Sequence, residues 1–402
     1  MTSAGNPAPT LDAAIRAAFP DLAGTYLDVS ARGPLPLAAR RAAEAMLLSQ
    51  ATGAIAKADW FDMAERVRRK AAAMLSVAPQ DIAFTKNASD GLNMVGAALR
   101  LKAGDRIVVA PAFEHPNNVL PWLWQAETNG AELVQIAPSQ GEDVEDAIIA
   151  AIDDRTRLVA VTSIDFASGR RTDLHRIGTV CRARGVFLLV DAAQSAGVLA
   201  EDMSVLPVDG WATAAQKGLL GLYGLGLLYV NPAWMDRLRP VFLARFSVDM
   251  AEANEAAGPE GGWQLKPNAG RFEVGNHNFV ALAALEASLD LLALVGRAEV
   301  ERRATSAAAT LRAGIADLGL PLLPLAEAHR GHIVSVGDAI GSGHDSTDTP
   351  WINALSIAIR EAGVVHSVRR GVLRLSTHVH ALPEVVARAL QSIEDWQRKT
   401  MR

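Results

Sequence analysis

The sequence is poor in cysteine: of its 402 residues, only Cys181 is a cysteine. A single cysteine excludes a disulfide framework and a cysteine-based metal site, and this usage suits a reducing compartment. Strong charge is lacking as well. The formal net charge is −5, and no Lys/Arg run with interleaved aromatics indicates a nucleic-acid binder. The most apolar stretch, 219–230, is short and contains glycines, so no membrane span is predicted.

The N-terminal residues lack the charged start and apolar core of a secretory signal, so a cytoplasmic location is expected. Half of the residues are apolar and 21% are charged, which is typical of a globular protein. At this length a chain exceeds the size at which one core usually stops growing. We therefore expect one large domain with a smaller partner.

Short apolar runs alternate with helical patterns through the middle of the chain, which predicts an α/β domain with a mostly parallel sheet. The predicted strands are 106–111, 132–137, 157–163, 186–191 and 224–230, and the first helices are 37–52 and 57–75. Residues 250–270 have no periodicity and are predicted to form a long surface loop. Helices at 279–295, 298–318 and 383–398 and strands at 332–336 and 372–376 then indicate a smaller α+β domain.

Asp191 directly follows an apolar strand, and Gln194 comes three residues later. Ligands in α/β sheets bind at the carboxyl ends of the strands. A carboxylate there could pair with the protonated ring nitrogen of pyridoxal 5′-phosphate (PLP). An Asp in this position could equally cap the next helix.

Lys217 lies between small residues and a glycine-rich apolar strand. Most lysines are solvated surface residues, but an amine shielded from water can form a Schiff base with an aldehyde cofactor. The nearby Gly-x-x-Gly-x-Gly precedes a strand, whereas a dinucleotide-binding fingerprint follows one, which disfavours a nicotinamide-dependent oxidoreductase.

Three further segments contain candidates for binding. Ala88 and Ser89 begin an apolar helix, where free N–H groups would suit a phosphate, although an ordinary cap would look the same. His115 could stack on an aromatic cofactor and move protons, or be structural. Arg374 lies in an apolar strand and needs an anionic partner, which could be a substrate carboxylate or a structural Asp or Glu.

Taken in order, these segments resemble the aminotransferase class V group of fold-type-I PLP enzymes, which includes cysteine desulfurases and isopenicillin N epimerase-like proteins. The resemblance runs from YLDVSARGPLP (26–36) to the final helix, through EHPNNVLPW, VDAAQSAG, QKGLLGLYGLGLLYV and RFEVGNHN. It implies an N-terminal segment (1–25) that packs with the small domain, a large PLP-binding domain (26–285) and a small C-terminal domain (286–402).

The resemblance also implies roles for the catalytic residues. Lys217 would hold PLP as a Schiff base and move the proton at the substrate α-carbon. Asp191 would pair with the pyridine nitrogen, Gln194 would bind the ring hydroxyl, and His115 would stack on the ring.

The remaining roles concern the phosphate and the substrate. Ser89, with the backbone of Ala88, would hold the phosphate, and Gln216 would lie near it. Asn276 would reach the phosphate of a neighbouring subunit, which implies a homodimer with shared active sites. Arg374 would clamp the substrate carboxylate. From their positions alone, Arg32 and the 250–270 segment are expected to help to select the substrate.

The departures from the family pattern bear on the reaction. Desulfurases carry a loop cysteine that becomes a persulfide, whereas Cys181 is predicted to be a core thiol in a helix. Gln216 stands where many desulfurase-like relatives have His, Ala214 replaces a hydroxyl, and Phe166 replaces an Asn. No metal site is predicted.

The predicted function is that of a PLP enzyme that acts on an α-amino acid through an external aldimine. The preferred reaction is β-elimination, of the C–S lyase type, from a cysteine-derived substrate without persulfide transfer. Transamination is second, because of the Gln216–Lys217 pair, and epimerisation is third. A non-catalytic PLP-fold binding protein is a further alternative.

Overall fold

The computed structural model describes residues 10–54, 56–139, 142–250, 262–341, 343 and 346–400. Its centre is a seven-stranded sheet with the order β2-β8-β7-β6-β5-β3-β4. These strands are β2 (Ile82–Thr85), β3 (Arg106–Val109), β4 (Glu132–Gln135), β5 (Thr156–Thr162), β6 (Phe187–Asp191), β7 (Gly210–Ala214) and β8 (Gly226–Val230). Strand β8 runs in the direction opposite to the other six strands of this sheet, which confirms the predicted α/β class with a mostly parallel sheet.

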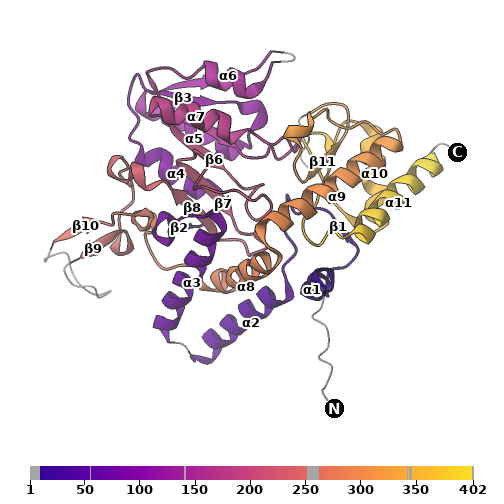
Figure 1. The fold of residues 1–402 in the computed structure, drawn as a ribbon, viewed down its shortest axis with the longest axis horizontal. Coiled ribbons are helices and arrows are strands. Elements are labelled where there is room, and N and C mark those ends of the chain that lie inside the picture. Colours follow the sequence, from indigo (N-terminus) through magenta and orange to yellow (C-terminus); the bar gives the residue numbers. More distant parts are fainter. Residues whose placement is uncertain are drawn as a thin grey trace.

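Helices cover both faces of the sheet. Successive side chains of a strand point to opposite faces, and in the central strands both sets are buried, so both faces must be covered. In β6, Leu188 and Val190 belong to one core cluster, and Phe187 and Leu189 belong to another. The covering helices are α3 (Lys57–Leu75), α4 (Ala88–Ala98), α5 (Leu120–Asn129), α6 (Val144–Ala150), α7 (Leu174–Arg184) and α8 (Phe279–Val295), and α2 (Leu37–Thr52) packs on α8 (Figure 1).

A smaller unit follows at the C-terminal end of the chain (orange to yellow in Figure 1). Its antiparallel sheet, β11-β14-β13, packs with three helices around a core of its own. The elements are α9 (Arg297–Asp317), β11 (Ile333–Val336), α10 (Pro350–Glu361), β12 (Val364–Val365), β13 (Ser367–Arg369), β14 (Val372–Ser376) and α11 (Pro383–Thr400). The sequence predicted strands β11 and β14 but not α10.

The N-terminal segment contacts this smaller unit. Helix α1 (Leu11–Ala18) places Arg16 2.7 Å from Glu384 of α11, and β1 (Thr25–Tyr26) pairs with β12 in parallel. The predicted division at 285/286 falls inside α8, whose buried side chains on both sides of that point, Leu285 and Leu289, share one core cluster.

The prediction that residues 250–270 form a long loop is wrong for the second half of that range. Strand β10 (Trp263–Leu265) pairs antiparallel with β9 (Val248–Met250), and a 3₁₀ turn follows at Ala269–Phe272. The buried side chains of Ala269 and Phe272 anchor this turn in the core. Residues 251–261 lie outside the described part of the chain.

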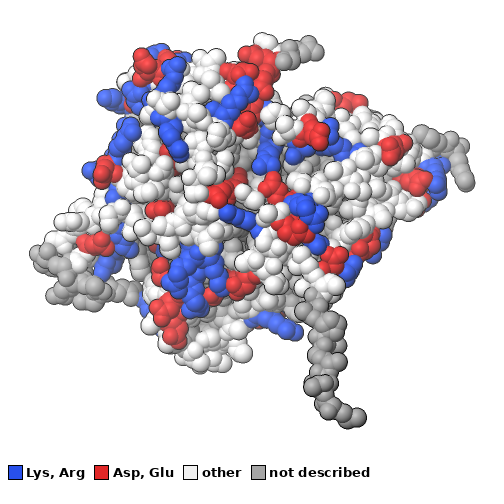
Figure 2. Space-filling view, in the orientation of Figure 1, with Lys and Arg blue, Asp and Glu red and all other residues white. Residues whose placement is uncertain are grey.

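No single helix within the described ranges is both long enough and apolar enough to cross a membrane. Helices α8 and α9 meet that criterion only as a pair, and they are bent by 82° at the break between them. On the face drawn in Figure 2, acidic and basic side chains are interspersed.

Candidate active site

The carboxyl ends of the central strands open into a cavity of about 320 Å³. Such strand ends are the usual ligand position in α/β sheets. Every cofactor residue predicted from the sequence except Asn276 lines this cavity. The lining comprises Lys86, Asn87, Ala88, Ser89, His115, Asn117, Thr162, Phe166, Asp191, Ala193, Gln194, Ala214, Gln216, Lys217, Tyr223 and Gly224.

Lys217 follows β7 and lines this cavity. Burial lowers the pKa of Lys217 to about 8, although the nearby Asp191 carboxylate opposes the shift. A lysine with a lowered pKa is more often neutral and therefore more nucleophilic. The backbone here is tightly packed: a Cβ on Gly33 would lie 2.2 Å from the Lys217 carbonyl oxygen. Only glycine at position 33 leaves room for this approach.

Asp191 ends β6 and is almost fully buried. Its Oδ1 accepts the Ala193 N–H at 2.9 Å. Burial raises the pKa of Asp191, and the neighbouring Lys217 partly counteracts this. A buried carboxylate requires a cationic or hydrogen-bonding partner, and a protonated pyridine nitrogen meets that requirement.

Gln194 has a buried polar atom that lacks a hydrogen-bond partner. Its Nε2 donates to the Ser30 carbonyl at 3.2 Å, but its buried Oε1 has no partner. A buried carbonyl oxygen without a donor is uncommon in folded proteins. The phenolic hydroxyl of pyridoxal phosphate is a suitable donor, so this orphaned acceptor supports the predicted cofactor.

The N-terminus of α4, which the sequence predicted as the phosphate site, lines this cavity. Asn87 caps the helix by accepting the Asp90 N–H at 2.9 Å. The Ser89 hydroxyl accepts a hydrogen bond of 2.8 Å from Asn117 Nδ2, which leaves its own proton free to be donated to an anion. Helix N-termini favour phosphate for the same reason. Asn117 was not identified from the sequence, because its contact with Ser89 joins separate segments.

His115 lies beside this group. Its Nδ1 accepts the Asn117 N–H at 3.1 Å, which places the proton of the neutral ring on Nε2. The ring packs edge-on against Phe166, with centroids 4.9 Å apart. Thr162, at the end of β5, also lines the cavity and was not predicted, although it follows a buried strand just as Asp191 does.

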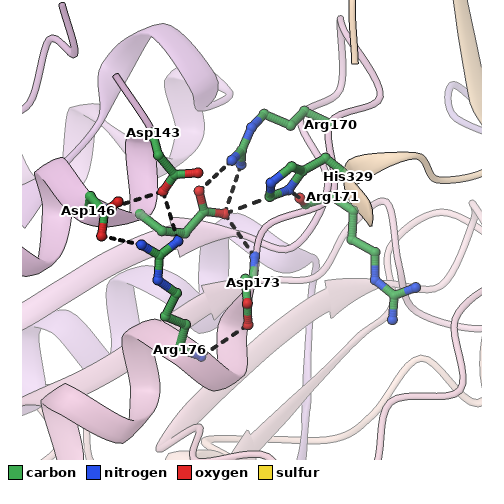
Figure 3. Close-up of polar contacts among 8 residues, drawn as sticks. Asp143, Asp146, Arg170, Arg171, Asp173, Arg176 and His329 are labelled. Atoms are coloured by element: carbon green, nitrogen blue, oxygen red, sulfur yellow. Dashed lines mark hydrogen bonds and ion pairs between the residues drawn. The ribbon is translucent and has the colours of Figure 1, made fainter. Parts of the chain in front are cut away.

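An ion-pair network holds the segment that carries Phe166. Glu145 is fully buried, and its carboxylate accepts from the Arg170 guanidinium and, at 2.9 Å, from the Asp173 N–H (Figure 3). His329 contacts the same segment through a 2.8 Å hydrogen bond between its Nδ1 and the Arg171 carbonyl. Ligand atoms of Asp143, Glu145 and His329 lie within 4.8 Å of one another. Since the Glu145 oxygens are already bonded, we interpret this cluster as structural.

The predicted substrate residues lie outside the cavity lining. Arg374 is 1% exposed; it donates to the Phe166 carbonyl at 2.6 Å and lies 3.5 Å from Asp28. It therefore has the structural acidic partner that the sequence left open, and a role as carboxylate clamp stays a prediction. Arg32 is exposed and lines a neighbouring cavity, which shares Gln216 and Tyr223 with the first.

Two other predicted residues lie away from this cavity. Asn276 is exposed on the segment before α8, so its predicted reach to a second subunit stays a prediction. Cys181 is fully buried in α7, as predicted, and burial raises the pKa of its thiol to about 12.

Comparison with known proteins identifies the family. Residues 25–386 match the model described as Aminotransferase class-V. The chain is 32% identical over 256 residues to a probable cysteine desulfurase of Methanothermobacter thermautotrophicus, which covers 63% of this chain and 62% of that protein. It is 30% identical over 296 residues to the cysteine desulfurase CsdA of Escherichia coli, over 70% of this chain and 71% of that one. The chain thus spans less than two thirds of the length of the first of these relatives.

Solved structures share the fold. The apo cysteine desulfurase of Thermococcus onnurineus superposes with a TM-score of 0.80 at 23% identity, over 94% of this chain and 95% of that one. A cystine C–S lyase in complex with cysteine persulfide gives 0.82 at 24% identity, over 94% and 99%. These likenesses and the family match confirm the fold-type-I class and the cofactor predicted from the sequence. The chain therefore belongs to the aminotransferase class-V family of PLP-dependent enzymes.

Proposed function

We propose that the protein is a PLP-dependent C–S lyase, which cleaves a cysteine-derived amino acid by β-elimination. One observation carries the proposal: Lys217, Asp191 and Gln194, whose Oε1 has no hydrogen-bond partner, all line the same cavity. The cofactor, when bound, withdraws electrons from the substrate α-carbon. In this proposal the chain's own residues bind it, orient it and move the proton.

Lys217 is the base in this scheme. Its lowered pKa leaves part of the amine neutral near pH 7, and a neutral amine can accept the α-proton. Asp191 stabilises positive charge on the ring nitrogen, and Ser89 with the α4 N-terminus fixes the phosphate. His115 also lines the cavity and is the residue proposed to stack on the cofactor ring.

The net reaction of a C–S lyase releases a thiol from the β-carbon and then, with one water, a keto acid and ammonia. The buried position of Cys181 supports release of sulfur rather than its capture on the protein, because a buried thiol with a pKa near 12 forms little thiolate. Persulfide transfer is the competing reaction, and the relatives described above are named cysteine desulfurases.

The proposal is tested with a panel of cysteine, cystine and S-alkyl cysteines, with keto acid, ammonia, sulfide and protein-bound sulfur measured separately. We expect keto acid and ammonia in equal amounts without an added acceptor, and full activity in Cys181→Ser. Lys217→Ala should be inactive and lose the absorbance band of the lysine-bound cofactor, while the exposed Lys102→Ala is the matched control. A strict requirement for a keto-acid acceptor would refute the lyase and favour transamination. Sulfur bound to Cys181 would refute release.

We also propose that the active protein is a homodimer. Asn276 is exposed, and exposed apolar side chains gather in the sequence before it, at Val241, Phe242, Leu243, Trp263 and Val274. Contiguous exposed apolar residues commonly mark an interface. Sedimentation at micromolar concentration tests the proposal: a monomer with full cofactor affinity would refute it.

A further inference from the structure

A buried histidine lies behind the lysine segment. His378 comes two residues after the end of β14 and is fully buried. Its Nε2 lies 2.9 Å from the carbonyl oxygen of Gly197 and 3.0 Å from that of Gly218. The ring thus contacts two segments of the large sheet domain from the residues that follow β14, the strand that carries Arg374.

The two partners determine the tautomer. Both are carbonyl oxygens, which only accept, so Nε2 must carry the proton. Nδ1 is buried and has no partner. Burial lowers the pKa of His378 to about 4, and the neighbouring His332 and His380 are also buried with lowered pKa values, so the ring is neutral at physiological pH.

The two carbonyls belong to segments of the active site that touch each other. A Cβ on Gly197 would lie 2.4 Å from the Gly218 carbonyl oxygen, and a Cβ on Gly218 would lie 2.4 Å from the Ala196 carbonyl oxygen. Gly218 directly follows Lys217, and Gly197 is three residues after Gln194. One N–H group therefore bridges the lysine segment and the segment that holds the ring-binding residues.

The same strand makes a second link to the site. The Ser376 hydroxyl accepts the Ser30 N–H at 2.9 Å, and the Ser30 carbonyl accepts from Gln194. Arg374 contacts the Phe166 carbonyl. From Arg374 to His378, alternate side chains thus hold successive parts of the cavity wall.

We propose that His378 is a positioning residue, whose Nε2–H group holds the Gly197 and Gly218 carbonyls together and thereby fixes Lys217 against Asp191. The inference rests on the proposed role of Lys217 as the cofactor lysine. It assigns His378 no contact with substrate or cofactor.

The test compares three variants of the full chain. His378→Phe keeps a planar ring but removes the donor, and His378→Gln restores an N–H donor. His366→Phe is the matched control, because His366 is also buried and its ring nitrogens form hydrogen bonds with Ser356 and Val364, within the smaller unit. The readouts are the Kd of pyridoxal phosphate for the cofactor-depleted protein and the pH dependence of its uptake rate, which reports the pKa of Lys217.

We expect His378→Phe to weaken cofactor binding about tenfold, as the loss of a hydrogen bond to a fixed segment implies. The apparent pKa of Lys217 should rise from about 8 toward its ordinary value, because a loosened segment admits water. His378→Gln should recover most of both properties. His366→Phe should lower the unfolding temperature and change neither.

If His378→Phe and His366→Phe lower stability alike and leave Kd and the uptake profile at parental values, the positioning role is wrong. If His378→Phe does not fold, the comparison of His378→Gln with the shorter His378→Asn replaces it, and equal cofactor binding in both would overturn the proposal. If the lyase assay shows no activity, the Kd of pyridoxal phosphate and its uptake profile still test the role of His378. Retention of covalent cofactor by Lys217→Ala would instead refute the role of Lys217.

Discussion

Replacing Lys217 with methionine measures how strongly the fold opposes a charge at the reactive position. Burial lowers the pKa of Lys217 from 10.5 to about 8. One pKa unit corresponds to about 1.4 kcal/mol, so the charged lysine destabilises the cofactor-free protein by about 3 kcal/mol at pH values below 8. Methionine has a similar length and carries no charge. We therefore expect cofactor-free Lys217→Met to be more stable than the parent at pH 7.

The sign follows from proton linkage. Between pH 8 and 10.5 the unfolded chain holds a proton on Lys217 that the folded chain has lost, so the stability of the parent rises with pH across this window. The advantage of the variant should shrink over the same range and vanish near pH 10.5.

Urea unfolding of the cofactor-free proteins at pH 7 and at pH 10 measures this difference directly. Lys102→Met, at an exposed position, is the control for the loss of a lysine charge elsewhere in the chain. A Lys217→Met variant that is less stable than the parent at pH 7 would refute the idea that burial, opposed only in part by Asp191, sets the reactivity of this lysine.

Three other substitutions test neighbouring contacts. Arg374→Met removes the cation beside Asp28 and should destabilise the protein by about 3 kcal/mol and raise KM. Thermal unfolding measures the first effect and steady-state kinetics measures the second. A variant with the stability of the parent would show that the ion pair contributes nothing. Burial lowers the pKa of His366 from 6.5 to about 4. On acidification, His366 is therefore protonated in the unfolded chain at a higher pH than in the folded chain. Between pH 7 and 5 the parent should lose about 2 kcal/mol relative to His366→Phe, measured by urea unfolding; a difference independent of pH would contradict this. Ser89→Ala should weaken cofactor binding about tenfold without loss of fold, measured by fluorescence titration; an unchanged Kd would exclude the hydroxyl as a ligand.

The sequence identified most of the elements that build the site. Apolar runs such as 187–191 could be recognised as strands because both of their faces are buried, and Pro383 begins α11 where the pattern predicted a helix. The sequence pattern did not predict helix α10. It predicted a loop where strand β10 lies, because three residues without alternating polarity carry no strand signal.

The sequence also predicted that Lys217, Asp191 and Ser89 lie at one ligand-binding edge, because each follows a strand or begins a helix, and the three line one cavity. Their partners depended on the tertiary structure. The Asp28 carboxylate beside Arg374, the bond from Asn117 to Ser89 and the bridge from His378 to two glycine carbonyls join segments far apart in the chain. No local pattern encodes such contacts, because they arise only when the elements pack, and that packing also sets the burial that lowers the pKa of Lys217.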